Sequence, residues 1–396
     1  MSPKPLYQDV KWLTSQVENY LEFCHPKCID TRNGGYSIQF DQETGDLYDP
    51  GSKHLVATCR YITNFSIGGI LGGPEWCLSA AKHGLTFLLD EHREGEHGGF
   101  HWLLNGTDVV DDSQRCYGHA FALLALARAG NTGIDLASKR LDEVYDLVID
   151  RFWEREHGLC RSEYVPDESS VIDYRGQNAN MHMCEAMIAA YETTGRDRYL
   201  DRAMTIADGI SRRLSVGTDG RIWEHYTPEW EHDFEYNRDD PTHQFRPWGY
   251  QPGHHLEWAK LLAILSRHHE AEWLTTRAEE LFALAIDDGW DEDAGGFYYT
   301  VSPDGDPIVT DKYAWEVAEA IGTAALLYEQ TGQGSYTAWY DEFWKYATDH
   351  LINPQLGIWY TKVTQENTPI PMKEGVSVGP SYHPIGACFE SINVFH

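Results

Sequence analysis

Hydrophobic and polar positions along the chain form two kinds of segment with a helical period. The first kind is rich in charge and has a single apolar stripe, which is typical of a helix that covers a core. These amphipathic segments span residues 7–24, 74–91, 134–151, 197–213, 269–286 and 333–350. The second kind is poor in charge, rich in Ala, Gly and Leu, and apolar nearly all round, as in a buried helix. These apolar segments span residues 55–70, 114–129, 178–193, 252–267, 312–330 and 383–394.

Short glycine signals recur between the helical segments, each followed by aromatic or aliphatic residues of strand type. The repeated glycines are Gly35, Gly99, Gly158, Gly220, Gly296 and Gly357, and successive ones lie 64, 59, 62, 76 and 61 residues apart. Each predicts a tight turn that opens a short hairpin. Six outer and six inner helices in alternation predict an all-α fold, an (α/α)6 barrel with short β-hairpins in its connecting loops. Nothing in the composition marks an internal boundary, so we expect one catalytic domain over residues 1–396.

The charge and composition of the chain exclude some classes of binding partner. The chain of 396 residues has a formal net charge of −31 and no stripe of lysine or arginine. We therefore expect neither nucleic acid nor an anionic membrane as a partner. The first residues, MSPKPLYQDVKW, lack an apolar signal core, and no apolar run reaches 18 residues, which predicts a cytoplasmic protein. The pair Cys24 and Cys28 has no second pair at zinc-site spacing, so reduced structural thiols are the better interpretation.

The inner segments each carry an ionisable residue at about the same phase of the repeat. Alone, such a residue is most simply a hydrogen-bonded core histidine or a charge at a helix end. Six in phase instead favour one ring around an axial pocket, because buried charge is costly unless it is paired or used. These residues are Arg60, His119, His182, His254, Glu319 and His383, with spacings of 59, 63, 72, 65 and 64.

Two of the histidines stand where a helix begins. His254 follows Pro252 and Gly253, and His383 precedes Pro384. The positive end of a helix dipole favours the neutral imidazole, which can accept or donate a proton near neutrality. Glu257 lies three residues after His254 and so shares its helix face. We interpret His255, His268 and His269 as solvated or structural.

Common cofactor motifs are absent. The sequence contains no HExxH, no cysteine–histidine quartet, no GxGxxG or GxxxxGK[ST] and no GxSxG, so we expect neither a catalytic metal nor a nucleotide. Histidines, glutamates and an arginine around a pocket suit proton transfer next to a carbonyl. An open-chain sugar would lose its C2 proton to form an enediolate, whose oxyanion Arg60 could stabilise. Return of the proton to C1 gives isomerisation, and return to C2 gives epimerisation.

Two long connections, residues 215–250 and 360–382, exceed the usual loop length, so we expect them to carry function. The first is crowded with aromatic residues, a composition typical of the rim of a carbohydrate cleft.

Several motifs resemble the N-acylglucosamine 2-epimerase superfamily over nearly the whole chain, and within it the aldose–ketose isomerases that act on mannose and related free sugars. They are RGQNANMH (175–182), PGHHLEW (252–258), KYAWEVAE (312–319), YH (382–383) and the arginine of TCRYITNFS (58–66). The resemblance implies an (α/α)6 barrel and chemistry without a cofactor. PGHHLEW is closer to the isomerases than to the cellobiose epimerases, in which an aspartate commonly follows the histidine.

The resemblance also implies roles for individual residues. His254 and His383 correspond to the general acid and base, and Glu257 and Glu319 to the acidic residues that assist proton transfer. The residues expected to contact substrate are Arg60, Tyr117, His119, Asn178, His182, Lys312 and Trp315. Where the family often has a second tryptophan and a glutamine, this chain has Ala314 and Val317, so a sugar contact is missing or replaced.

The sequence therefore predicts a sugar isomerase that acts on a monosaccharide, D-mannose with D-fructose, and on D-lyxose with D-xylulose as a further pair. Three alternatives stay open. A 2-epimerase of mannose or of a β-1,4 disaccharide uses the same chemistry. An inverting glycoside hydrolase needs two facing carboxylates, which a ring made mostly of histidine disfavours. A sugar-binding protein without activity would leave these positions unused. Nothing in the sequence indicates the oligomeric state.

Overall fold

The computed structural model describes residues 5–95, 98–165, 172–243, 245–371 and 381–396, and within these residues the chain is mainly helical. Six inner helices surround a common axis: α2 (Leu55–Ile70), α4 (Cys116–Asn131), α6 (Gln177–Thr194), α8 (Pro252–Ser266), α10 (Ala314–Thr331) and α12 (Tyr382–Phe395). Six outer helices cover them: α1 (Val10–Cys24), α3 (Trp76–Phe87), α5 (Asp135–Arg151), α7 (Asp197–Asp208), α9 (Glu272–Gly289) and α11 (Gly334–Tyr346).

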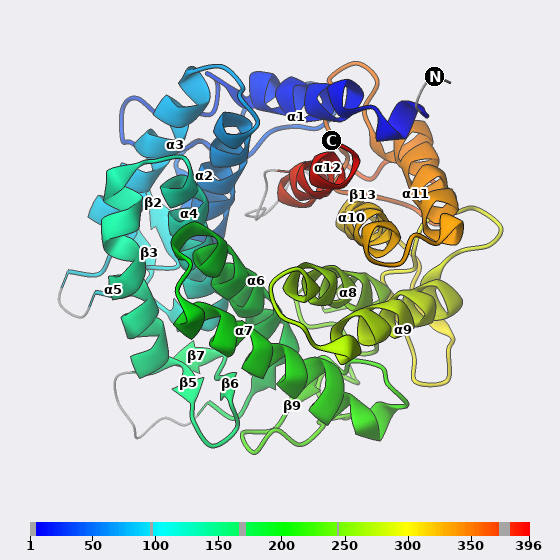
Figure 1. Cartoon of the computed structure of the whole chain (residues 1–396). Helices are drawn as coiled ribbons and strands as arrows, with labels where there is room; N and C mark the ends of the chain where they lie inside the picture. The colour runs from blue at the N-terminus through cyan, green and yellow to red at the C-terminus, as the bar shows by residue number, and fades with distance from the viewer. Residues whose placement is uncertain (1–4, 96–97, 166–171, 244, 372–380) are drawn as a thin grey trace.

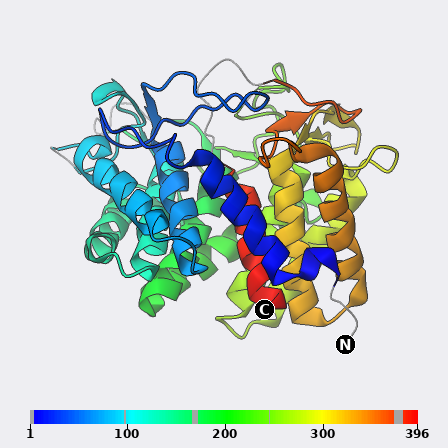
Figure 2. The same ribbon diagram turned by 90° about the horizontal axis from the view of Figure 1, so that it is seen from above.

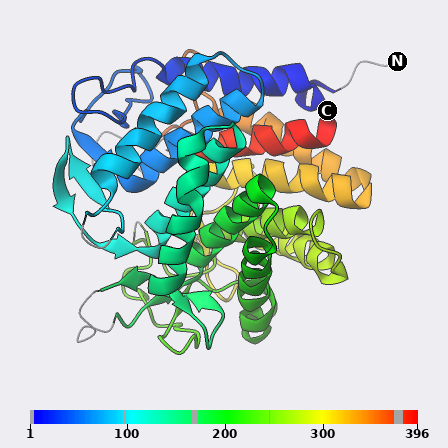
Figure 3. The ribbon, with the colours of Figure 1, turned by 60° about the vertical axis from the view of Figure 1, so that its left-hand side comes forward.

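The inner helices form a closed ring (Figure 1). Each contacts the next one along the chain, and α12 contacts both α10 and α2, which closes the circle. Each of α3, α5, α7, α9 and α11 packs on the inner helix that precedes it, and α1 packs on α12. Figure 3, in which the left-hand side comes forward, shows α3 and α5 outside the inner ring. The predicted (α/α)6 barrel is confirmed.

Burial explains the two sequence patterns. In the inner helix α2, every residue from Leu55 to Gly68 is buried. In the outer helix α5, the buried positions recur at intervals of three and four residues. Three outer helices continue into a π-helical turn, at Leu88–His92, Gly209–Arg213 and Ala347–Leu351. These turns account for the predicted segments that extend beyond α3, α7 and α11.

Short strands occupy the connections. They are β1 (Ser52–His54), β2 (Leu103–Asn105), β3 (Asp108–Asp111), β4 (Gln114–Arg115), β5 (Trp153–Glu154), β6 (Leu159–Cys160), β7 (Glu163–Tyr164), β8 (Arg175–Gly176), β9 (His225–Tyr226), β10 (Thr300–Val301), β11 (Pro307–Val309), β12 (Lys312–Tyr313) and β13 (Lys362–Val363). They pair antiparallel as β1–β2–β3, β4–β7, β5–β6, β8–β9, β10–β11 and β12–β13. They gather at one end of the barrel, away from the two chain ends (Figure 2).

The glycine turns were predicted largely correctly. Isolated antiparallel bridges span the turns at Gly35, Gly99, Gly296 and Gly357, and β5 pairs with β6 around Gly158. Most of these glycines have a positive φ, for example 69° at Gly158 and Gly357, a conformation that side chains with a Cβ rarely adopt.

The turn at Gly220 differs from the other five. It follows a 3₁₀ helix, Leu214–Thr218, and is closed by a backbone hydrogen bond from Arg221 to Thr218 in place of a bridge.

Strands lead directly into inner helices, so the N-termini of the inner helices face the hairpin end of the barrel. β1, β4, β8 and β12 run into α2, α4, α6 and α10 respectively. All eight cysteines are buried free thiols. Among the described residues, no helix is both long and apolar enough to cross a membrane.

Candidate active site

A cavity of about 470 Å³ opens at the hairpin end of the barrel axis. The histidines, the glutamate and the arginine of its lining come from the first two turns of inner helices, at the positive ends of their dipoles, where a developing anion is favoured. The lining residues from inner helices include Arg60, Tyr117, Asn178, His182, His254, Glu257, Trp315, Tyr382 and His383.

These side chains lie in two tiers, where the sequence predicted one ring. The upper tier consists of the second or third residue of five inner helices: Tyr117, Asn178, His254, Trp315 and His383. The lower tier consists of the sixth residue of four inner helices: Arg60, His182, Glu257 and, behind the cavity lining, Glu319. The tiers are about one helical turn apart, roughly 5 Å. Because the repeat spacings vary by several residues, they cannot distinguish two positions one helical turn apart, and the sequence pattern therefore predicted a single ring.

His383 belongs to a chain of three buried groups. Its Nδ1 lies 2.7 Å from Glu319 Oε1, and Glu319 Oε2 lies 2.5 Å from Lys260 Nζ. Because an ionised carboxylate only accepts hydrogen bonds, Nδ1 carries the proton and Nε2 is left unprotonated. Burial lowers the pKa of His383 to about 4, with Arg60 and Lys260 adding to the effect and Glu319 opposing it. His383 is therefore neutral at neutral pH, as a general base must be.

His254 is held in a similar way by a different carboxylate. Its Nδ1 lies 2.9 Å from Glu224 Oε1, and the amide nitrogen of Gln177 lies 3.0 Å both from Glu224 Oε2 and from the same Nδ1. Gln177 is itself oriented by Trp258, whose indole N–H donates to Gln177 Oε1 at 2.7 Å. The Nδ1 proton goes to Glu224, so Nε2 of His254 is again the nitrogen available to a substrate.

Trp315 connects the two histidines. Its ring centroid lies 5.2 Å from that of His254 and 5.6 Å from that of His383. An indole face suits the C–H surface of a sugar ring or chain. A sugar that lies on Trp315 therefore has an imidazole available from α8 and another from α12.

Arg60 supplies the positive charge of the lower tier and is almost completely buried. Its guanidinium lies 3.3 Å from the Tyr117 hydroxyl and 3.5 Å from His383 Nε2. The same group lies over the rings of Phe121 and Tyr382, at 4.7 and 5.1 Å from their centroids. These contacts fix a cation next to the proposed base, where it can stabilise an oxyanion.

Glu257 is the acid of the lower tier. Its side chain is 1% exposed, and neither carboxylate oxygen has a hydrogen bond to any described residue. Burial raises its pKa well above the usual value, and the negative charges of Glu319 and Glu185 raise it further. Lys260 and Arg60 oppose this shift, and a carboxyl with a raised pKa is suited to donate a proton into the cavity.

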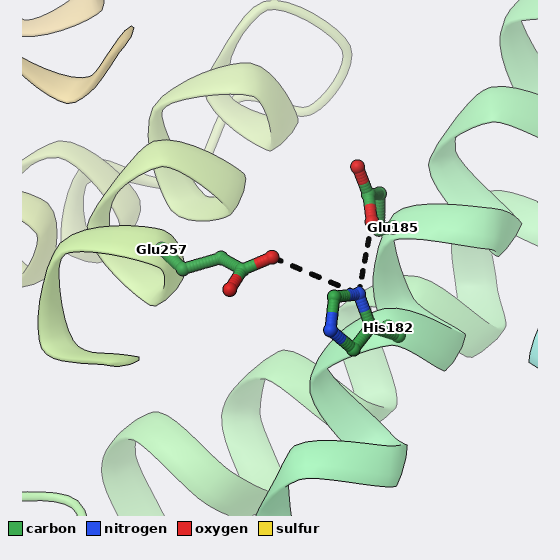
Figure 4. Close-up of side chains that lie close together, drawn as sticks. All are labelled: His182, Glu185 and Glu257. Atoms are coloured by element: carbon green, nitrogen blue, oxygen red, sulfur yellow. Dashed lines mark hydrogen bonds and ion pairs between the residues drawn. The ribbon is translucent and has the colours of Figure 1, made fainter. Parts of the chain in front are cut away.

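His182 lies beside Glu257 (Figure 4). Its Nδ1 is 3.2 Å from Glu185 Oε2 and 3.7 Å from Glu257 Oε1. The Tyr382 hydroxyl donates to the other oxygen of Glu185. Two sets of side chains therefore have the donor atoms to hold a metal ion: His182, Glu185 and Glu257, and Glu257, Glu319 and His383.

Two residues that were expected to contact substrate lie elsewhere. His119 is fully buried, with Nδ1 2.8 Å from the Arg115 carbonyl and its ring against Phe152. It is the fourth residue of α4, one residue past the face of α4 that meets the cavity. Lys312 is buried in an ion pair with Asp291 at 2.9 Å, next to the turn at Gly296. Neither lines the cavity.

The connection 215–250 contributes less to the cavity than its aromatic content predicted. Trp223, Tyr226 and Trp230 are buried and pack among themselves and their neighbours. Thr242 and Phe245 line the cavity mouth, and Phe245 is exposed. From the second connection, Tyr360, Thr361, Lys362, Ser381 and Tyr382 reach the cavity, while residues 372–380 lie outside the described part of the chain.

Sequence reasoning also missed four groups that hold the site: Gln177, Glu185, Glu224 and Lys260. For Lys260 a signal was present, because it is a lone lysine in an apolar inner helix and follows Glu257 by three residues. Glu185 follows His182 by the same interval. Glu224 lies in an irregular connection with no periodicity, so no pattern could have paired it with His254.

The geometry describes an (α/α)6 barrel whose axial cavity carries carboxylate-held histidines, a class suited to proton transfer on a sugar. The N-acylglucosamine 2-epimerase (GlcNAc 2-epimerase) family model matches residues 34–387. A D-mannose isomerase of Marinomonas mediterranea is 38% identical over 98% of both chains, and one of Thermobifida fusca is 35% identical over 91% of this chain and 88% of that one. A crystal structure of D-mannose isomerase superposes with a TM-score of 0.95 at 38% identity, covering 99% of this chain and 100% of that chain. This chain belongs to the N-acylglucosamine 2-epimerase family.

Proposed function

We propose that this protein is an aldose–ketose isomerase that interconverts D-mannose and D-fructose without a cofactor. One observation carries the proposal. His254 and His383 flank Trp315, and each is held at Nδ1 by a buried carboxylate, so that each presents Nε2 to the cavity. The similarity to proteins named D-mannose isomerase supports the choice of sugar.

In the proposed reaction, Nε2 of His383 takes the C2 proton of the open-chain aldose. The electrons of the C2–H bond form the C1–C2 double bond, and the carbonyl oxygen becomes an oxyanion that Arg60 stabilises. Protonation of that oxygen from Glu257 gives a cis-enediol. The imidazolium of His383 then gives its proton to C1, while Nε2 of His254 accepts the O2 proton and passes it to the Glu257 carboxylate, so that the ketose forms and each group returns to its starting state. Glu319 keeps the Nδ1 proton of His383 in place throughout.

Epimerisation is the second candidate, because His254 and His383 come from different helices on either side of Trp315. A proton delivered to C2 from the opposite face would convert mannose to glucose. The same two histidines serve both reactions, and the product depends on which carbon receives the proton.

The test is to incubate the purified protein with D-mannose and EDTA in deuterated water and to follow the products by proton NMR. Fructose with deuterium at C1 is the expected result. Glucose with deuterium at C2 would show that the protein is an epimerase and contradict the proposed isomerase activity. Unchanged mannose would contradict both, and disaccharides would then be tested for hydrolysis.

A further inference from the structure

The three side chains of Figure 4 have a property that the proposed reaction does not use. His182, Glu185 and Glu257 place one nitrogen and two carboxylate oxygens within 4.8 Å of one another, and His182 and Glu257 also line the cavity. His182 Nδ1 lies 3.2 Å from the Glu185 oxygen and 3.7 Å from the Glu257 oxygen. In a tetrahedral zinc site, bonds of about 2.1 Å separate neighbouring ligand atoms by roughly 3.4 Å. The two observed distances bracket that separation.

Glu257 provides an independent observation. It is 1% exposed, and both of its oxygens lack a hydrogen bond to any described residue. Buried carboxylate oxygens normally have a hydrogen-bond partner or a bound ion. The unpartnered oxygen of Glu257 that faces His182 Nδ1 is therefore consistent with a site for a cation between the two side chains. Figure 4 shows the Glu257 carboxyl reaching from α8 toward the imidazole on α6.

Neighbouring groups are already arranged as a metal site needs. The Tyr382 hydroxyl donates a hydrogen bond to Oε1 of Glu185, and Oε2 is left facing His182. Hydrogen bonds of this kind commonly orient the carboxylates that bind metal ions. The positive charge of Lys260 is balanced by Glu319, 2.5 Å away. Two carboxylate ligands would balance the two charges of a divalent ion. Since Glu257 also lines the cavity, a fourth coordination position would open into it.

We propose that His182, Glu185 and Glu257 bind a divalent cation of the zinc class, and that the bound cation excludes the sugar. One imidazole and two carboxylates suit zinc and neighbouring transition metals better than magnesium or calcium, which prefer all-oxygen sites. The cation takes Glu257 and His182 out of the reaction, so it acts as an inhibitor and not as a cofactor.

Calorimetric titration of the EDTA-treated, dialysed protein with zinc chloride tests the site without any need for turnover. We expect one ion per chain with micromolar or tighter affinity. Co²⁺ should give the visible absorption of a four-coordinate ion. Glu185→Gln and Glu257→Gln should each weaken binding by at least about tenfold. The matched control is Glu192→Gln, which removes a partly exposed His–Glu contact of the same 3.2 Å length, with His268, and should leave binding unchanged.

Competition gives the second measurement. Saturating D-mannose should weaken zinc binding to the parent protein, because both occupy the cavity. The proposal is overturned if the parent protein binds no stoichiometric ion, or if folded Glu185→Gln and Glu257→Gln variants, checked by circular dichroism, bind as the parent does. Should either variant fail to fold, His182→Gln replaces it under the same criterion. Failure of the isomerase assay would leave this titration unaffected, so the two proposals are tested separately.

Discussion

The two ends of the barrel use the same kinds of ionisable residue in opposite ways. At the end away from the hairpins, arginine–glutamate pairs lie in the C-terminal halves of the inner helices or just beyond them. Arg128 lies 2.9 Å from Glu192, and Arg267 lies 3.2 Å from Glu390. Each carboxylate there has a permanently charged arginine as a partner, and the two pairs join α4 to α6 and α8 to α12. Glu192 also contacts His268, but this contact lies at the surface and not in the cavity.

At the hairpin end, the carboxylates face histidines. Glu224 and Glu319 each hold an imidazole, and Glu257 faces His182 without a hydrogen bond. An imidazole can gain or lose a proton under ordinary conditions, whereas a guanidinium cannot. The comparison indicates what sets the expected role of a glutamate: an arginine partner joins it to a neighbouring element, and a histidine partner in the cavity allows the proton transfer that we propose.

The largest expected effect comes from removing a histidine at the hairpin end. His383→Gln should lower turnover of mannose roughly a thousandfold, because a general base contributes about two to four orders of magnitude. Loss of deuterium exchange at C2, followed by NMR, identifies the step. His268→Gln is the matched control, since His268 also contacts a glutamate, Glu192, at the other end of the barrel. Turnover of the His383 variant close to that of the parent would contradict the assignment.

A second variant disrupts the hydrogen-bonded series Lys260–Glu319–His383. Lys260→Met leaves Glu319 buried without its 2.5 Å partner, and we expect a loss of about 3 kcal/mol of unfolding free energy together with reduced kcat. Lys260→Arg, which keeps the charge, should restore part of the kcat. Arg267→Met removes a half-buried cation at the opposite end and should cost about 1 kcal/mol with kcat unchanged. Urea unfolding and initial rates measure both, and equal effects on kcat would contradict the comparison.

A third prediction concerns pH. His383 must be neutral to accept a proton, and its pKa is lowered to about 4. The kcat/KM should therefore stay level as the pH falls toward 5 and drop about tenfold per unit below about 4. Lys260→Met removes one of the positive charges that lower this pKa, so its acid limb should move to higher pH. Circular dichroism at each pH separates protonation from acid unfolding, and an acid limb near the ordinary histidine pKa would contradict the prediction.

The smallest effect is expected for Glu192→Gln. Glu192 is partly exposed and pairs with Arg128, so its loss should change the unfolding free energy by no more than about 1 kcal/mol. Its mannose turnover should stay within about twofold of the parent. A larger loss of turnover would mean that the far end of the barrel influences the cavity.

The fold could be predicted because helical period and turn glycines are local properties. Apolar segments such as 55–70 match α2 at both ends, since an inner helix buried on every side has no polar face to confuse the pattern. The predicted C-terminal ends of three outer helices were less accurate, because π-helical turns follow α3, α7 and α11 and continue the same sequence pattern.

The candidate site could be predicted only where the cavity lining follows the repeat of the inner helices. His182, His254 and His383 recur with the inner helices, and all three line the cavity. His119 recurs with them too, but each residue advances the helix by about 100°, so one position is enough to turn a side chain away from the axis. The contact between Glu224 and His254 depends on how the loop before α8 folds over that helix. Tertiary structure determines this contact, so no local sequence pattern predicts it.

The last inner helix has a consequence for folding. His383 lies on α12, the element that closes the ring by packing on α1, α2 and α10. While α12 is undocked, Glu319 keeps Lys260 as a partner but lacks its histidine, and the cavity lacks one of its two carboxylate-held imidazoles. If His383 is the base that we propose, closure of the ring and the onset of activity are the same event.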